Sequence, residues 1–214
     1  MKKFQVVGIG NAMVDVLAHA DEAFLDTNGI GKGIMQLIDM PRAVALYDRI
    51  GPAREISGGS AANTIAGVAH LGGRTAYVGK VKDDQLGRIF AHDLRAQGAV
   101  YETPLAARDS EQETGRCIIL VTGDGERSMN TYLGWSEFLT PADIDEGQMA
   151  EAEWIYLEGY RFDGPASHEA FAKANHFNGT PVMVRPSDGA VLQGYRPAAE
   201  IRGLLGLDQN KGGR

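Results

Sequence analysis

Asn11, Asp15 and Asn63 carry side chains of the types that bind the hydroxyl groups of a sugar. An amide both donates and accepts hydrogen bonds, and a carboxylate accepts them from neighbouring hydroxyls. The glycine pair Gly58 and Gly59, just ahead of Asn63, lets the backbone pass close to a ligand. Together these residues predict a polyol site. Taken alone, Asn11 and Asp15 are also explained by a turn. The glycine pair, taken alone, is also explained by a loop that packs a strand against a helix.

Gly8 and Gly10 raise a different prediction, a dinucleotide-binding loop. That loop has the pattern Gly-X-Gly-X-X-Gly at the end of a strand and the start of a helix. Met13 stands where the third glycine is required, and no uninterrupted helix follows. We therefore interpret the two glycines as part of a tight turn at a strand end.

Strands and helices are expected to alternate around these residues. Apolar runs predict strands over residues 4–9, 13–17 and 75–78. Between the second and third of these strands, apolar residues at helical spacing predict a helix that Ser60 caps and Gly72 ends. The candidate polar residues would then lie at a strand end and at a helix start.

Beyond residue 80 the same reasoning predicts a helix that Asp83 or Asp84 caps and Gly98 ends, and an antiparallel hairpin over 116–133. Further patterns predict a helix start at 140–143, strands over 154–157 and 180–184, and a helix over 165–174. The order predicts an α/β core built from βαβ units and interrupted by a sheet-like insertion.

Several motifs resemble the PfkB family of sugar and nucleoside kinases, also called the ribokinase family, between about residues 6 and 174. The segments that carry this resemblance are Gly58-Gly59-Ser60-Ala61-Ala62-Asn63, Gly72-Gly73, Val78-Gly79-Lys80-Val81 and Asp84-Gln85-Leu86-Gly87. Within the family, the segments similar to adenosine-kinase-like members are Ser60, Met35-Gln36-Leu37, Thr114-Gly115-Arg116-Cys117 and residues 125–134.

The resemblance implies a three-layer ribokinase-like α/β core with a small β-sheet lid and a substrate site between them. A partial domain over 1–185 would contain lid segments at about 12–57 and 99–137. The substrate-binding residues on the ribose side would be Asn11, Asp15, Gly58, Gly59 and Asn63. Those on the base side would be Gln36, Cys117, Met129 and Leu133, while Arg127 would approach the transferred phosphate. Packing within the hairpin is the other explanation for Cys117, Met129 and Leu133.

The resemblance also implies ATP and Mg²⁺ as cofactors, and a general base in a Gly-Ala-Gly-Asp motif near the C-terminus. The sequence lacks that motif and the metal-associated Asn and Glu positions ahead of it. We therefore expect no nucleotide site, catalytic residue or metal ligand in this chain, and little or no turnover. Residues 186–190 also depart from the Leu-Ser-Asp-Pro-Phe of relatives. The expected fold is C-terminally incomplete, with a divergent, poorly ordered tail over 186–214.

The composition of the chain limits the classes of partner that it can bind. A chain of 214 residues with 43% hydrophobic residues can bury a substantial core. Its net charge of -7 gives no general attraction to nucleic acids or anionic membranes, and no segment is long and apolar enough to span a bilayer. Cys117, the only cysteine, cannot form an internal disulfide, which favours a cytoplasmic setting.

The leading hypothesis is therefore a kinase acting on an adenosine-like nucleoside or a sugar, in a chain that is itself inactive. One alternative is a non-catalytic module that binds a nucleoside or sugar, or that forms a homodimer through its lid. A nonfunctional remnant that folds poorly is a third reading.

Overall fold

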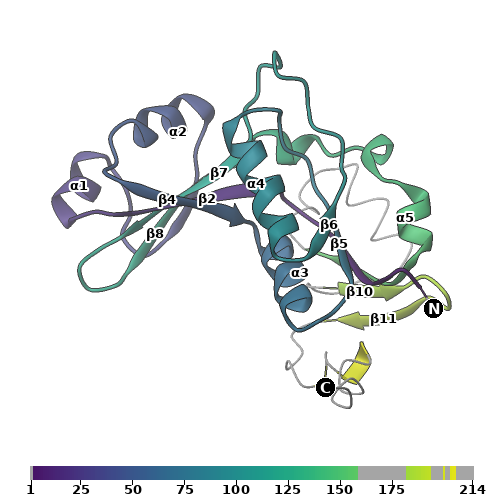
Figure 1. Cartoon of the computed structure of the whole chain (residues 1–214). Helices are drawn as coiled ribbons and strands as arrows, with labels where there is room; N and C mark the ends of the chain where they lie inside the picture. The colour runs from purple at the N-terminus through teal and green to yellow at the C-terminus, as the bar shows by residue number, and fades with distance from the viewer. Residues whose placement is uncertain (1, 159–181, 194–199, 201–202, 206–214) are drawn as a thin grey trace.

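Two β-sheets, each with its own helices, organise the chain (Figure 1). The computed structural model describes residues 2–158, 182–193, 200 and 203–205. We call the 6-stranded sheet the core sheet and the 5-stranded sheet the lid sheet. In Figure 1 the lid sheet projects from one side of the core. Within the described residues, no helix has the length and apolar character needed to cross a bilayer.

The core sheet is parallel in its centre and antiparallel at one edge. Its strand order is β11-β10-β9-β1-β5-β6. The strands span Phe4–Ile9 (β1), Thr75–Val78 (β5), Ala99–Tyr101 (β6), Ala152–Leu157 (β9), Val182–Arg185 (β10) and Ala190–Gln193 (β11). Ile9 lies opposite both Val78 and Leu157, so three parallel strands end at the same level. The predicted strands at 4–9, 75–78 and 154–157 are thereby confirmed.

Helices cover both faces of the core sheet, which makes the expected three layers. Helices α3 (Ser60–His70) and α4 (Gln85–Ala96) pack on one face. On the other face, Ile144 and Met149 contact Phe4, Val7 and Ile9. Met149 belongs to α5 (Glu146–Ala150), which follows the short 3-10 helices η1 (Gly134–Phe138) and η2 (Pro141–Asp143).

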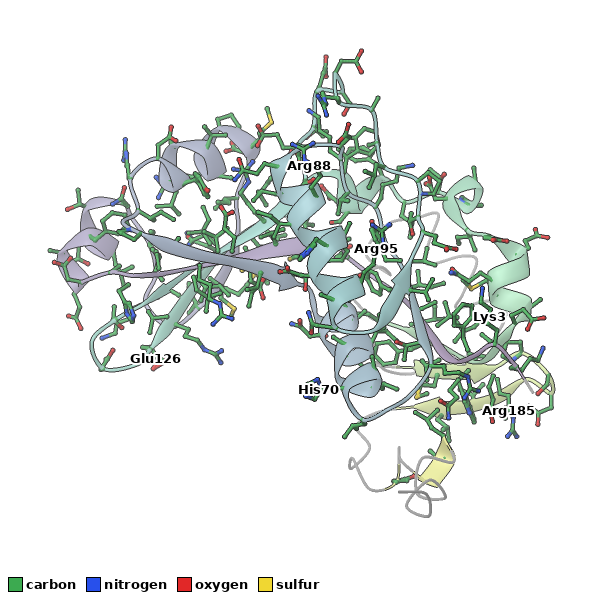
Figure 2. All side chains as sticks on the ribbon, in the orientation of Figure 1. Lys3, His70, Arg88, Arg95, Glu126 and Arg185 are labelled. Carbon is green, nitrogen blue, oxygen red and sulfur yellow. The ribbon has the colours of Figure 1, made fainter. Side chains whose placement is uncertain are left out.

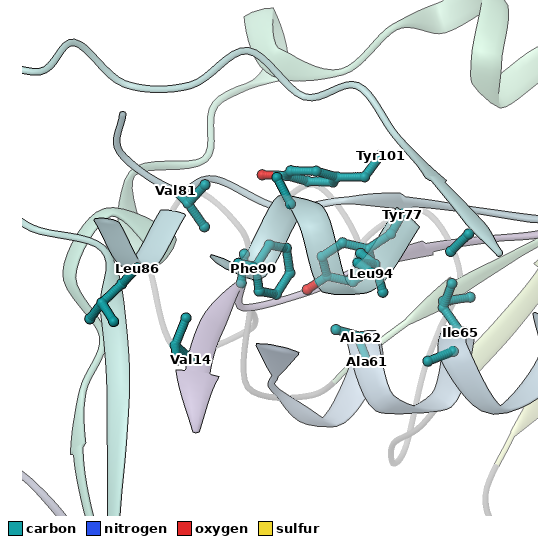
Figure 3. Close-up of a cluster of buried hydrophobic side chains, with 14 of the residues drawn as sticks. Val14, Ala61, Ala62, Ile65, Tyr77, Val81, Leu86, Phe90, Leu94 and Tyr101 are labelled. Carbon is teal, nitrogen blue, oxygen red and sulfur yellow. The ribbon is translucent and has the colours of Figure 1, made fainter. Parts of the chain in front are cut away.

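An aromatic cluster joins α4 to the core sheet (Figure 3). Phe90 packs against both Tyr77 and Tyr101, with its ring centroid 5.9 Å and 5.2 Å from theirs, and the two tyrosine rings lie 6.2 Å from each other. Asp84 caps α4 by accepting a hydrogen bond from the Gly87 amide at 2.7 Å. Leu86, Phe90 and Leu94 lie on the buried face of α4, as the helical spacing predicts.

The N-cap of α3 differs from the prediction by one residue. Gly59, with φ of 95°, is the N-cap, and Ser60 is the first helical residue. The chain turns sharply from the lid sheet into the helix at Gly59, where a left-handed backbone is needed. At the other end α3 stops at His70, and Leu71 is 41% exposed.

The lid sheet has the strand order β3-β8-β7-β2-β4. These strands span Met13–His19 (β2), Met35–Leu37 (β3), Ala53–Gly58 (β4), Gly115–Val121 (β7) and Arg127–Tyr132 (β8). Strands β7 and β8 form the predicted antiparallel hairpin, and Figure 2 shows Glu126 at its tip. Helices α1 (Glu22–Thr27) and α2 (Met40–Tyr47) belong to the same lobe.

Side chains of the lid strands alternate between two environments. Val14, Val16, Ile118 and Leu120 join the large core cluster that also contains Leu46 of α2. Met13, Cys117 and Ile119 form a separate small cluster on the opposite face. Because neighbouring residues of a strand point to opposite faces, one face packs on helices and the other is left for a cavity.

Two features differ from the expected boundaries. β6 pairs with β5 in the core sheet, although residue 99 was assigned to the lid. β11 pairs with β10 beyond residue 185, where the divergent tail was expected to begin. The helix start predicted at 140–143 is confirmed as the 3-10 turn η2, with Thr140 as N-cap and with Asp143 accepting from the Thr140 amide and hydroxyl. The helix predicted at 165–174 lies outside the described residues.

Candidate functional site

A cavity lies where the chain passes between the core and lid sheets. Residues 10–12 connect β1 to β2, and Gly59 connects β4 to α3. The cavity has a volume of about 510 Å³. It is lined by Asn11, Met13, Asp15, Met35, Leu37, Gly59, Ser60, Asn63, Cys117, Ile119, Arg127, Met129, Thr131, Leu133 and Glu158. Segments distant in sequence thus contribute to one site.

Three polar residues of the lining come from the first crossing segment, from β2 and from the start of α3. Asn11 is buried in the segment that connects β1 to β2, and Asp15 lies on β2. Asn63 is in the first turn of α3, where its backbone N–H donates to the Gly59 carbonyl oxygen at 2.9 Å. The structure therefore brings Asn11, Asp15 and Asn63 to one cavity.

Asp15 is the carboxylate on the lid side of this cavity. Burial raises the pKa of Asp15 to about 6, because removal of water disfavours the charged form. A carboxylate with this pKa is ionised at neutral pH and lacks full hydration. It can therefore regain hydrogen bonds by accepting them from ligand hydroxyls.

The two glycines ahead of α3 have different structural roles. A Cβ atom at residue 58 would lie 2.5 Å from Oδ2 of Asp15, so Gly58 leaves room for that carboxylate. Gly59 has a positive φ, and a Cβ atom there would overlap the backbone carbonyl oxygen of Asn11. Gly59 lines the cavity, whereas Gly58 lies behind Asp15 and is not among the lining residues.

Most of the cavity lining that the lid sheet supplies is apolar. The lining apolar side chains are Met13, Met35, Leu37, Ile119, Met129 and Leu133. Cys117 lies among them, and the Thr131 hydroxyl donates to its Sγ at 3.3 Å. Burial raises the pKa of the Cys117 thiol to about 11. Cys117 is therefore a neutral wall residue rather than a nucleophile.

Gln36 does not line the cavity, although it was predicted on the base side. Its neighbours Met35 and Leu37 do so, and strand alternation sends Gln36 to the other face of β3. There its Nε2 donates to Oδ1 of Asn130 on β8 at 2.7 Å. The amide thus links two lid strands.

Strand alternation could have identified most of the lining residues that the sequence analysis missed. Met13 is two residues from Asp15, Ile119 two from Cys117, and Thr131 two from Met129. Met35 and Leu37 flank the residue that was chosen. Glu158 directly follows the strand predicted at 154–157, and carboxyl ends of parallel strands are frequent binding positions.

Arg127 lies on β8 at the exposed side of the cavity. Among the described lining residues it is the only cationic side chain. No three His, Cys, Asp or Glu residues in the described part of the chain are placed to hold a metal ion. A triphosphate with Mg²⁺ requires several positive or metal-binding partners. The described residues therefore do not fit ATP with Mg²⁺.

Comparisons with known proteins agree with this fold. The adenosine kinase from Sinorhizobium meliloti is 52% identical and superposes with a TM-score of 0.71, over 81% of this chain and 53% of that one. A probable sugar kinase protein from Rhizobium etli CFN 42 is 49% identical, with a TM-score of 0.72 over 82% of this chain and 53% of that one.

Sequence relatives agree as well. Fructokinase-2 of Solanum habrochaites is 28% identical over 155 residues, which is 72% of this chain and 40% of the fructokinase. The chain thus spans about half the length of the relatives it matches. The sequence pattern described as pfkB family carbohydrate kinase matches residues 30–201. The chain therefore belongs to the pfkB family of carbohydrate kinases and has its ribokinase-like fold.

Proposed function

We propose that this chain is the substrate-binding portion of an ATP-dependent kinase that phosphorylates a hydroxyl group of an adenosine-like nucleoside. One observation carries the proposal: Asn11, Asp15, Gly59 and Asn63 line one cavity together with an apolar lid wall. A ribose offers vicinal hydroxyls to the first set, and a flat base offers its apolar faces to the second. The 52% identical protein named adenosine kinase supports the same ligand class.

A free sugar is the neighbouring candidate, because relatives named fructokinase also match the chain. The apolar wall favours the nucleoside. A free sugar carries hydroxyls around its whole ring, so it would leave some of them against Met129, Met35 and Leu37 without partners.

Isothermal titration calorimetry with adenosine, ribose and fructose tests this proposal. We expect saturable binding of adenosine that Asp15→Ala weakens at least about tenfold, since a hydrogen bond to a charged group contributes about 1.5–3 kcal/mol. Asp26→Ala, an exposed position on α1, is the matched control and should leave binding unchanged. Absence of binding for all three compounds would refute the proposal.

A lid variant separates nucleosides from sugars. Met129→Ala should weaken adenosine binding by about tenfold, the loss expected for one buried apolar side chain, and should change ribose binding far less. Met40→Ala, at the start of α2 and outside the cavity lining, is its control. Equal losses for adenosine and ribose would favour the sugar.

A homodimer formed through the lid is the second candidate function. Strand β3 is an edge of the lid sheet, and Ile34, Met35 and Leu37 near this edge are 53%, 48% and 64% exposed. Exposed edges of this kind pair readily with a second strand. Sedimentation velocity should detect a dimer that Ile34→Lys dissociates, with adenosine binding retained. A monomer at all concentrations would contradict it.

We also propose a cytoplasmic setting, on the ground that Cys117 is free and buried. In a reducing compartment a cysteine thiol stays reduced without a disulfide partner.

A further inference from the structure

A second cavity lies beside α4, between this helix and the segment that follows β6. Its volume is about 500 Å³, within the range of pockets that hold small molecules. The helix contributes Arg88, Ala91, His92, Arg95 and Ala96 to the lining, and the segment after β6 contributes Thr103 and Leu105. We call this cavity the α4 groove. None of these residues lines the substrate cavity.

The helix side of the groove carries three basic side chains. Arg88, His92 and Arg95 are four and three residues apart, so they follow one stripe of α4. Figure 2 shows Arg88 and Arg95 along this helix. No acidic residue is among the groove residues that the structure describes, although the chain has a net charge of -7. A positive cavity on an acidic protein favours an anionic ligand.

The two arginines are held in place and still have donors for a ligand. Nε and Nη2 of Arg95 donate to the Tyr101 carbonyl oxygen at 3.0 Å and 2.7 Å, and its Nη1 has no partner in the described part of the chain. Arg88 uses Nη1 for Asp83 at 2.9 Å, and its Nε and Nη2 have no partner there. An anion can therefore accept hydrogen bonds from both side chains without displacing the existing ones.

The carboxylates that contact this stripe are themselves engaged elsewhere. Asp83 also pairs with Arg108, at 3.2 Å. Asp93 accepts from the Ser57 amide at 3.1 Å with one oxygen, and its other oxygen lies 3.3 Å from Nδ1 of His92. Neither carboxylate lines the groove, so the positive charge there is only partly neutralised.

The other side of the groove is fixed by contacts with the segment after β5. The Gly79 amide donates to the Thr103 hydroxyl at 3.3 Å, and the Ala106 amide donates to the Val81 carbonyl oxygen at 2.9 Å. Leu105, between these two anchors, is 41% exposed. A preformed groove with an exposed apolar side chain suits a ligand that carries an apolar part beside its charge.

We propose that the α4 groove binds a small phosphate ester, with the phosphate against Arg88, His92 and Arg95 and the apolar part of the ligand against Leu105. A phosphate offers several acceptor oxygens, which match the forked donors of two arginines. The groove is separate from the substrate cavity, so this inference does not depend on the proposed function.

An NMR titration of the isotope-labelled full chain with phenyl phosphate tests the site. Phenyl phosphate has the required charge and apolar part, and it lacks a ribose. We expect saturable shifts of the Ala91, His92 and Leu105 amides. Inorganic phosphate should give the same pattern at about tenfold higher concentration, because the apolar contact is missing. Saturable shifts at Arg127 in the substrate cavity instead, or no saturable shift at all, would overturn the proposal.

Four variants identify the contacts. Arg88→Gln should weaken phenyl phosphate binding about fivefold, and Asp83→Asn, which frees Arg88 from its ion pair, should strengthen it about twofold. Leu105→Ser should weaken binding of phenyl phosphate and leave that of inorganic phosphate unchanged. Arg54→Gln, at an exposed position of β4 outside the groove, is the matched control and should bind as wild type does. Equal losses in Arg88→Gln and Arg54→Gln would show nonspecific attraction and refute the site.

A poly-glutamate peptide distinguishes a small ligand from an acidic partner protein. We expect it to shift the same amides only at higher concentration than phenyl phosphate does. Tighter binding of the peptide would assign the groove to a protein partner and would overturn the proposal. Failure of the wild type to bind adenosine would refute the proposed function and would leave this inference standing.

Discussion

Single residues explain why this site requires its glycines. Gly58 makes room for the Asp15 carboxylate, and Gly59 has a backbone conformation that other residues rarely adopt. The glycine pair therefore positions the Asp15 side chain and the start of α3.

A variant at the first glycine tests this reading. Gly58→Ala should displace the Asp15 carboxylate and weaken adenosine binding at least about tenfold, since the charged hydrogen bond would be lost. Gly67→Ala is the control, because Gly67 is exposed on α3 and a Cβ atom there would meet nothing within 4 Å. It should leave binding unchanged and stabilise the helix by about 0.5–1 kcal/mol. Unchanged binding in Gly58→Ala would contradict the explanation.

Asp15 also predicts how stability depends on pH. Its pKa is raised from 3.8 to about 6 in the folded protein, so the folded state holds this proton more tightly than the unfolded chain does. Asp15 therefore destabilises the ligand-free fold progressively as pH rises from about 4 to above 6. The melting temperature of Asp15→Asn, relative to wild type, should increase over this range. Calorimetric melting at several pH values measures it, and a constant difference would disprove the link.

At the level of elements, strand alternation decides which side chains face the ligand. Asp15, Cys117 and Met129 share one face of the lid sheet, whereas Val14, Ile118 and Asn130 share the other. The hairpin and its residues are predictable from sequence. Gln36 was predicted to line the cavity from the family resemblance alone, whereas its pairing with Asn130 of β8 puts it on the other face of the lid sheet.

Asp84 joins two elements and explains part of the Asp84-Gln85-Leu86-Gly87 motif. It caps α4 at the Gly87 amide, and it accepts from the Thr114 amide at 2.9 Å and from the Thr114 hydroxyl at 2.7 Å. Thr114 immediately precedes β7 of the lid sheet and is fully buried. One carboxylate thus ties a core helix to the lid.

Removing the Asp84 carboxylate should lower the stability of the fold. Asp84→Ala should lower the free energy of unfolding by about 2–3 kcal/mol, the sum expected for a lost cap and two lost hydrogen bonds. Asp83→Ala is the matched control, since Asp83 pairs only with Arg88 and Arg108 at the surface in the described structure, and it should cost less than about 1 kcal/mol. Urea unfolding measures both, and equal losses would refute the assignment.

At the level of the whole molecule, the described lid, cavity and core sheet form one unit, while the chain spans about half the length of its relatives. The polar and apolar walls of the cavity are present. The described lining supplies one cation, Arg127, and the sequence lacks the Gly-Ala-Gly-Asp motif. We therefore expect this chain to bind its substrate without transferring a phosphoryl group to it.

The purified chain should bind adenosine and transfer little or no phosphate from MgATP to it. The physical reason is that phosphoryl transfer depends on positioned charges around the phosphates, and the cavity provides few of them. A coupled assay of ADP formation, run beside calorimetry on the same sample, measures both properties. Turnover at ordinary kinase rates, about 1 s⁻¹ or more, would contradict the expectation.

The amino-acid sequence alone determined strands β1, β2, β5 and β9, helices α3 and α4, and the hairpin, because these depend on local periodicity and turn chemistry. The types of their side chains suggested Asn11, Asp15 and Asn63 as one set of ligand-binding residues. Tertiary structure decided which faces of the lid strands line the cavity and that Gly58 leaves room for the Asp15 carboxylate. It also decided that β10 and β11 extend the core sheet and that Glu158 lines the cavity. Those outcomes depend on how distant segments pair across two sheets, and no local pattern specifies that pairing.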